Sequence, residues 1–325
     1  MTDDVMNPAL PAEQPVSSDP VERIAEGSLT TWLDKVEAPT WALIVAVYLS
    51  LGLLTYYATA LPVWLLVPLA AVAVCWYSHL QHELVHGHPT RNSRFNTLFG
   101  LLPFTLYMPY SLYKKTHLLH HATPALTDPD FDTESYFVSQ EYWDRASAPV
   151  RWLLVANQSM LGRFVLGPFL MYYAFWKEEL LRMVEGDFSH AGDWLLHFVL
   201  VGALLSWTSF VCGLSVPEYI FYFAIPGASL GLLRSYAEHR PGPSNADRTA
   251  IIESSWFIRL LFLNNNLHAI HHTKPNLAWY KINRDYRANK DSWLKRNGGY
   301  FYKDYLQLAK SYFFRPKAHP VHPGY

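Results

Sequence analysis

Histidine carries the strongest chemical signal in this chain, because its spacing repeats in a way that fits metal binding. Nine of the 15 histidines fall into four groups along the sequence. Residues at i and i+4, or at i, i+3 and i+4, share one face of a helix, so each group can point its imidazoles at a common site. The groups are His82 with His86; His117 with His120 and His121; His239 alone; and His268 with His271 and His272.

The number and type of these side chains favour a pair of redox-active metal ions. Imidazole is the commonest metal ligand, and it leaves the charge of the metal uncompensated. Nine ligands are too many for one zinc ion, which takes four, and they fit two ions that keep open positions. The two cysteines, Cys75 and Cys212, lie in apolar runs and form no Cys-x-x-Cys pair. This disfavours structural zinc, soft copper sites and iron–sulfur clusters, and iron best explains such a site beside a bilayer.

The remaining six histidines lie outside these groups. We interpret His79, one helical turn before His82, as a polar residue near the membrane surface. His88 precedes Pro89 and leaves the helix, so it is at most an outer neighbour of the site. The other four fit no group, and replacing His322 with alanine is predicted to change little: His190, His197, His319 and His322.

Acidic residues near the histidines have two interpretations each. Glu83, between His82 and His86, can accept a hydrogen bond from a ligand imidazole. It can equally pair with Arg91 or Arg94. A run of acidic residues after the second group can support that group or form a solvated loop: Asp128, Asp130, Asp132 and Glu134.

Four apolar runs supply the elements that must position these groups. Each is close to the roughly 20 residues that a helix needs to cross about 30 Å of hydrocarbon. Short turns around residues 61–62 and 213–217 join them in pairs, which predicts two tight transmembrane hairpins. The runs cover residues 40–58, 62–80, 195–212 and 217–233.

Basic residues predict how these hairpins are oriented. Neither short turn contains Lys or Arg, so the positive-inside rule puts the histidine groups and both termini in the cytosol. The sequence therefore predicts an all-α integral membrane protein with two hairpins, four spans and a cytosolic, histidine-rich helical cap. The basic residues on the cytosolic side include Arg91, Arg94, Lys114, Lys115, Arg151, Arg234 and Arg240.

Composition agrees with the membrane class. Half of the residues are apolar and 16% are charged, against roughly 25% charged in soluble proteins. The net charge of −1 gives no indication of nucleic-acid binding. Two interrupted apolar stretches, 99–113 and 152–176, are interpreted as interfacial or re-entrant helices. We divide the chain into a disordered polar arm (1–28), a membrane domain (29–290) and a cytosolic tail (291–325).

The histidine groups resemble the histidine boxes of the membrane fatty acid desaturase superfamily. That superfamily has a His-x(3–4)-His box, then two His-x(2–3)-His-His boxes, with an extra histidine before the last. The resemblance covers roughly residues 40–285. It implies that the nine grouped histidines hold two iron ions, which use O2 to desaturate or hydroxylate the hydrocarbon chain of a fatty acyl lipid.

The same resemblance implies partners and a place in the cell. Electrons would come from a separate protein of the ferredoxin, rubredoxin or cytochrome b5 type, and the enzyme would be a multi-pass protein of the cell (inner) membrane. One feature departs from acyl-CoA desaturases, which have an asparagine four residues before the histidine equivalent to His239. Ser235 stands there instead.

Local features leave the subfamily open. Asp128-Pro-Asp130 and the Arg-Pro after His239 are similar to carotenoid ketolases, and Glu238 before His239 is similar to alkane hydroxylases. Residues 276–280 resemble acyl desaturases. A carotenoid ketolase or hydroxylase and an alkane hydroxylase therefore remain alternatives. A membrane haem-binding or metal-transport protein is a more distant one, because it would place histidines within the spans.

Overall fold

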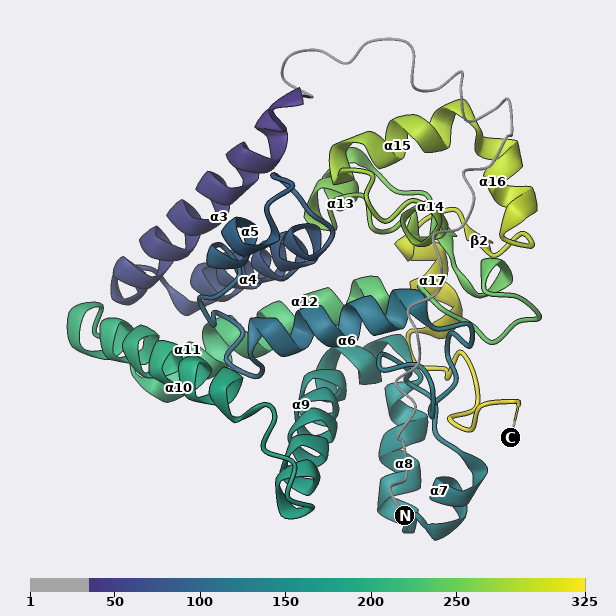
Figure 1. Ribbon diagram of the computed structural model, residues 1–325, viewed down its shortest axis with the longest axis horizontal. Helices are drawn as coiled ribbons and strands as arrows, with labels where there is room; N and C mark the ends of the chain where they lie inside the picture. The colour runs from purple at the N-terminus through teal and green to yellow at the C-terminus, as the bar shows by residue number, and fades with distance from the viewer. Residues whose placement is uncertain (1–34, 325) are drawn as a thin grey trace, which may run out of the picture.

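The structure is a computed structural model that describes residues 35–324 (Figure 1). Helices dominate that range. Its sheet is a parallel pair of two-residue strands, β1 (Ile251–Ile252) and β2 (Phe301–Tyr302). The all-α prediction is confirmed. The polar arm predicted for residues 1–28 lies outside the described residues.

Four helical segments in the described range are long and apolar enough to cross a membrane. The first hairpin consists of α3 (Ala38–Tyr56) and α4 (Val63–Val85). The second consists of Ala191–Val211 and Val216–Ser235. Gly213 turns the chain between them with a φ of 68°, a left-handed conformation that glycine adopts without strain. The two predicted hairpins are confirmed, and Figure 1 shows their turns at one end of the molecule and the histidine-bearing helices at the other.

The first hairpin contains one boundary that the sequence placed wrongly. The second apolar run was predicted to end near residue 80, but α4 continues to Val85. His82 and Glu83 therefore lie inside the spanning helix, and His86 is its C-cap. The helix stops there because Gly87 takes a φ of 85°. The apolar run ends near residue 80 because polar residues begin there, but the helix continues through those polar residues.

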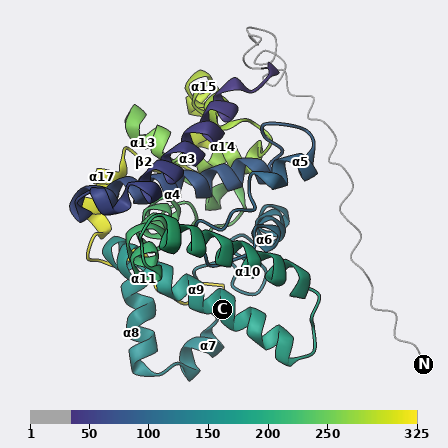
Figure 2. The ribbon, with the colours of Figure 1, turned by 90° about the vertical axis from the view of Figure 1, so that its left-hand side faces the viewer.

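The two hairpins pack closely enough to share one core. The second hairpin is built from α10 (Ala191–Ser206), the short π-helix η2 (Trp207–Val211), α11 (Val216–Tyr219), the short π-helix η3 (Ile220–Ala224) and α12 (Ile225–Ser235). Helix α4 packs against both α3 and α12 and lies between them (Figure 1), and Figure 2 shows α3 alongside α4 from another side. A Cβ added at Gly227 would lie 2.4 Å from Val74 Cγ1, so glycine is what allows α12 to approach α4. This packing fixes the histidine-side ends of α4 and α12 side by side.

Residues 99–109 are not helical, contrary to the prediction of an interfacial helix over 99–113. They follow α5 (Ser93–Leu98) and lead into α6 (Tyr110–Ala122). Pro103 and Pro109 have no N–H to donate, which disfavours a continuous helix. Side chains from the surrounding helices satisfy the exposed carbonyls. Donors are Tyr48 to Phe99 O (2.7 Å), Tyr77 and Gln81 to Gly100 O (2.7 and 2.8 Å), Tyr219 to Phe104 O (3.0 Å) and Trp176 to Tyr107 O (2.6 Å).

The second interrupted stretch forms a bent pair of helices. The chain bends by 120° between α8 (Ala148–Asn157) and α9 (Met160–Val184). The Ser159 hydroxyl caps α9 by accepting from Gly162 N at 3.0 Å. Figure 1 shows α9 running across the direction of α12, against which it packs. This geometry fits a broken span or a re-entrant pair. The sequence had indicated interfacial or re-entrant helices, and the re-entrant alternative agrees with it.

Short helices complete the histidine side of the molecule. The strand pair β1–β2 and the contact of α17 (Tyr305–Tyr312) with α9 hold residues beyond 291 against the preceding chain. The division of the chain at residue 291 into a membrane domain and a cytosolic tail remains a prediction. The remaining elements are η1 (Ala58–Ala60), α7 (Gln140–Arg145), η4 (Ala246–Arg248), α13 (Trp256–Leu261), α14 (His268–Thr273), α15 (Trp279–Ala288), α16 (Lys290–Arg296) and α17 (Tyr305–Tyr312).

Candidate metal centre

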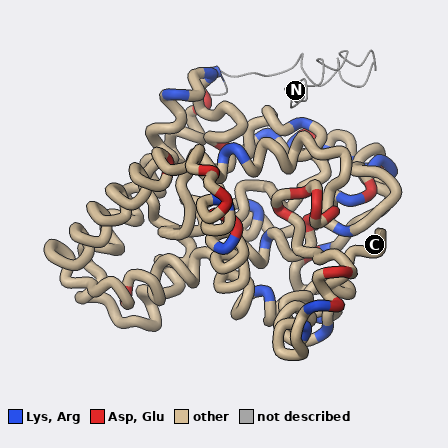
Figure 3. Tube along the Cα trace, turned by 60° about the horizontal axis from the view of Figure 1, so that its bottom comes forward, with Lys and Arg blue, Asp and Glu red and all other residues tan. Residues whose placement is uncertain are grey.

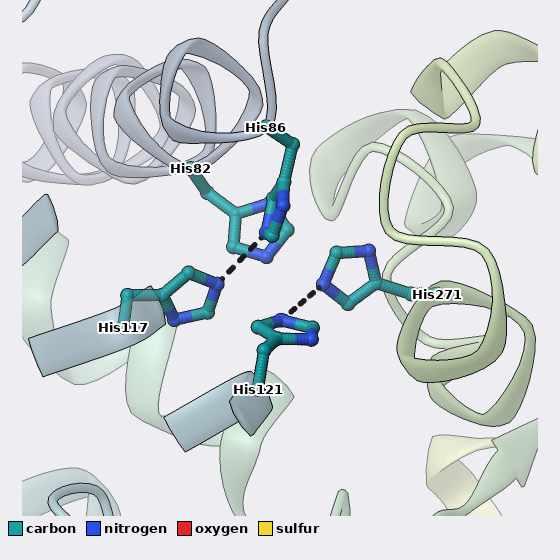
Figure 4. A group of neighbouring side chains, drawn as sticks. All are labelled: His82, His86, His117, His121 and His271. Atoms are coloured by element: carbon teal, nitrogen blue, oxygen red, sulfur yellow. Dashed lines mark hydrogen bonds between the residues drawn. The ribbon is translucent and has the colours of Figure 1, made fainter. Parts of the chain in front are cut away.

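All nine predicted histidines converge, and they form two separate groups. Within each group every residue offers a ligand atom, and those atoms lie within 4.8 Å of one another. We call them the five-histidine group and the four-histidine group. Figure 4 shows the rings of the first turned toward a common centre. The five-histidine group is His82, His86, His117, His121 and His271, and the four-histidine group is His120, His239, His268 and His272.

Helices α6 and α14 each serve both groups. Successive residues on a helix are about 100° apart, so adjacent histidines in a His-x-x-His-His box cannot face the same point. On α6, His121 faces the five-histidine group while His120 faces the other. On α14, His271 and His272 divide in the same way. The expectation that each triple shares one site was therefore wrong. The two groups lie next to each other, and the rings of His121 and His272 stack between them with centroids 4.3 Å apart.

The imidazole nitrogens within each group approach one another closely. Nε2 of His86 is 3.0 Å from Nε2 of His117 in the five-histidine group. Nε2 of His268 is 3.0 Å from Nε2 of His239 in the four-histidine group. Nε2 of His82 is buried with no hydrogen-bond partner in the described range. Unpartnered buried nitrogens aimed at one point fit the donor set of a metal ion.

Carboxylates accept hydrogen bonds from Nδ1 of three rings, and a fourth carboxylate lies beside Nδ1 of His268 without a hydrogen bond. An imidazole that donates its Nδ1–H to a carboxylate keeps Nε2 free of a proton and aimed inward. The Nδ1-to-carboxylate distances are 3.3 Å for His82–Glu83, 2.8 Å for His117–Glu134, 2.6 Å for His120–Asp132 and 3.2 Å for His268–Glu238. The geometry thus favours the supporting interpretation of Glu83 and, within the acidic run, of Asp132 and Glu134.

Comparison with known proteins agrees with this architecture. Residues 58–304 match the fatty acid desaturase family. The chain belongs to that family. It is 25% identical over 224 residues to a fatty acid desaturase of Bacillus subtilis, which covers 62% of this chain and 60% of that protein. It is 25% identical over 199 residues to fatty acid desaturase 3 of Bos taurus, which covers 60% of this chain and 39% of that protein. The chain thus spans less than two thirds of the length of either relative.

Two residues of this desaturase-family site escaped the sequence analysis. Glu238 was noted only for its similarity to alkane hydroxylases, yet it lies beside His268. Asn265 is fully buried, and its amide nitrogen is 3.3 Å from His82 Nδ1. A flipped amide would instead accept the Nδ1 proton. The run Asn264-Asn265-Asn266, just before the last box, was the available signal. Ser235, which stands where acyl-CoA desaturases have an asparagine, has its hydroxyl oxygen 3.0 Å from the Tyr136 hydroxyl.

The six histidines outside the boxes also lie outside both groups. His79 Nδ1 faces the Cys75 carbonyl at 2.7 Å, one turn back along α4. His88 pairs with Glu37 at 2.8 Å. Their partners are protein atoms, which agrees with the prediction that they are not ligands. The others contact Glu179 (His190), the Leu106 carbonyl (His197), the Trp143 ring (His319) and Thr127 (His322).

Burial keeps most of the grouped imidazoles neutral. Desolvation and neighbouring imidazoles hold the pKa values of His271 and His272 well below the usual range. Burial, aided by His120, lowers the pKa of His239 to about 3. A neutral imidazole offers a lone pair, so these residues are ready to bind a metal at neutral pH.

One ring of the four-histidine group differs in its electrostatics. Burial works to lower the pKa of His120, but Glu134 and Asp132 outweigh that effect and raise it. The hydrogen bond from His120 in turn outweighs burial and lowers the pKa of Asp132. His120 and Asp132 therefore stabilise each other: Asp132 stays ionised and increases the basicity of the His120 imidazole.

Proposed function

We propose that this protein is an oxygen-dependent di-iron oxidoreductase that desaturates the hydrocarbon chain of a fatty acyl lipid. The observation that carries the proposal is the division of nine histidines into two groups, each with ligand atoms within 4.8 Å of one another. Family membership over residues 58–304 supports the choice of reaction class. Hydroxylation of the same chain is the alternative, since both reactions begin with removal of a hydrogen atom.

The five-histidine and four-histidine groups would each hold one iron ion. Nitrogen-only donor sets with open positions suit iron that meets O2, and neither group contains a thiolate. When bound, the iron pair would supply the O2 activation that breaking an unactivated C–H bond requires. The carboxylates would fix which nitrogen of their partner rings carries the proton, so that the other nitrogen is free to bind iron.

The proposal includes a substrate, a partner and an orientation. The groups lie at one end of the four candidate spans, where a lipid chain would reach them from the bilayer. A separate electron-transfer protein, of the ferredoxin, rubredoxin or cytochrome b5 type, would supply the electrons. We place this side, with both termini, in the cytosol and the protein in the cell (inner) membrane, because Lys and Arg are absent from both hairpin turns.

Metal analysis combined with lipid profiling tests the proposal. His271→Ala removes a member of the five-histidine group, and His190→Ala, whose ring contacts Glu179 and neither group, is its control. We expect about two irons per chain in the wild type and in His190→Ala, together with a lipid that has lost two hydrogens. The variant His271→Ala should lose that product and bind less iron. Zinc or haem in place of iron, with unchanged lipids and pigments, would reject the proposal.

A further inference from the structure

The side chain of Lys317, five residues after α17, is held over backbone oxygens. Its Nζ donates to the carbonyls of Tyr236 (2.9 Å) and His239 (3.0 Å) and to the Tyr300 hydroxyl (3.4 Å). These three bonds use every donor of an ammonium group. Its partners are thus neutral oxygens, and among the described residues no carboxylate lies within 4.0 Å of Nζ. Lys317 is partly buried, and withdrawing a cation from water without an ionic partner is unfavourable, so this contact needs an explanation.

The segment that Lys317 holds is the one that presents His239. It leaves α12 at Ser235 and reaches His239 four residues later. His120 donates its Nδ1–H to Asp132, and His268 has the Glu238 carboxylate 3.2 Å from Nδ1, although without a hydrogen bond. In the described range Nδ1 of His239 is buried with neither a hydrogen-bond partner nor a carboxylate within 4.0 Å. The direction of the His239 ring therefore depends on its backbone. Two side chains fix that backbone from the far side: Lys317, and Tyr300, which donates to the Ala237 carbonyl at 2.7 Å.

The same C-terminal stretch that carries Lys317 also carries His322, and the contacts of His322 lead to His120. Gly324 N donates to Nδ1 of His322 at 3.1 Å, so the ring proton lies on Nε2, which is 3.1 Å from the Thr127 hydroxyl. Thr127 N donates to Asp132 Oδ2 at 2.8 Å. The other oxygen of Asp132 is the partner of His120. The chain around His322 is itself anchored by two backbone bonds with Val138, of 2.9 and 3.0 Å.

We infer that residues 317–322, which we call the C-terminal strap, position the four-histidine group for metal binding. This inference rests on the proposed function. The strap is connected to two members of that group, to His239 through its backbone carbonyl and to His120 through Thr127 and Asp132. In the described structure its hydrogen bonds reach no residue of the five-histidine group. Lys317 is a positioning residue, and its loss should weaken one metal site and leave the other intact.

Lys317→Met tests the inference, because methionine keeps a long apolar stem and removes all three donors. The full-length protein, purified in detergent and loaded with 57Fe, would be compared with wild type by iron content and Mössbauer spectroscopy. We expect the affinity for one iron to fall roughly 10–100-fold, with the spectrum of the other unchanged. Lys317→Arg, which can donate to more than one oxygen, should restore both signals. The exposed Lys310→Met on α17 is the control.

His322→Ala provides an independent second variant, and for it the structure revises the expectation that this histidine matters little. It should lower the affinity for the same iron, by less than Lys317→Met, because it acts through two intervening residues. Two irons bound with wild-type affinity in Lys317→Met would overturn the inference, as would equal weakening of both irons in the two variants. If the wild type itself bound no pair of irons, the proposed function would fail, whatever the strap does.

Discussion

The carboxylates of Asp132 and Glu134 differ in how tightly they hold their histidines. Side-chain exposure is 1% for Asp132 and 34% for Glu134, although both accept from an imidazole on α6. Water competes for an exposed carboxylate and screens its charge, so Glu134 interacts more weakly with its histidine. Asp132 also accepts from Thr127 N and Glu134 N, at 2.8 and 2.9 Å, which fixes its orientation. The imidazole of His120 is therefore the more firmly positioned of the two.

Asp132→Asn is expected to weaken the four-histidine group selectively. The amide keeps the shape of the carboxylate but not its charge, so His120 becomes a poorer donor of electron density to a metal. We expect affinity for one iron to fall roughly 10–100-fold, and Glu134→Gln to have a smaller effect on the other. Competition with a chelator, followed by iron analysis, measures both. Equal effects of the two variants would mean that burial of the carboxylate does not govern this support.

At the scale of elements, the histidine boxes were predictable and their division was not. The spacing on α6 depends only on helical geometry, so it could be read from the sequence. Which ring faces which group depends on how α6 and α14 are rotated against α4, and distant packing contacts fix that rotation. For the same reason Asn265 could not be placed beside His82: they are far apart in sequence, and nothing local joins them.

The non-helical segment 99–109 was mispredicted for a related reason. Its apolar residues suit a helix at the membrane surface, but the donors for its carbonyls come from other helices. Backbone that leaves a helix at membrane depth is tolerated only where other groups satisfy its hydrogen bonds. A hydropathy pattern cannot reveal that Tyr48, Tyr219 and Trp176 will converge on one segment. The segment then delivers the chain to Pro109, the N-cap of α6.

Gly100→Ala should disturb α6 through this segment. A Cβ at Gly100 would lie 2.7 Å from the Tyr110 ring, in the first residue of α6. Overpacking of this kind destabilises by roughly 1–3 kcal/mol, because either the ring or the helix must move. We expect a lower Tm in detergent together with reduced iron content. Gly52→Ala, where an added Cβ meets no atom within 4 Å, is the matched control and should leave both unchanged or raise the Tm slightly.

Charge is distributed unevenly over the whole molecule. Figure 3 shows Lys and Arg concentrated away from the turns of the two hairpins. No Lys or Arg occurs between Lys35 and Arg91, or between Arg182 and Arg234. These two ranges contain both turns, the first three spanning segments and all of the fourth except its last two residues. Basic residues are retained on the cytosolic side during insertion, so the pattern favours a single orientation of the protein in the membrane.

Cysteine labelling would test that orientation. In a background with Cys75→Ala and Cys212→Ala, Ala60→Cys places a thiol on the exposed turn of the first hairpin, and Ser292→Cys places one on exposed α16. A membrane-impermeant maleimide should label Ala60→Cys in intact cells and Ser292→Cys only after permeabilisation, because the bilayer separates the two positions. Labelling of Ser292→Cys in intact cells would put the histidine groups outside the cytosol. A cytosolic electron donor could then not reach them, and that part of the proposed function would have to be abandoned.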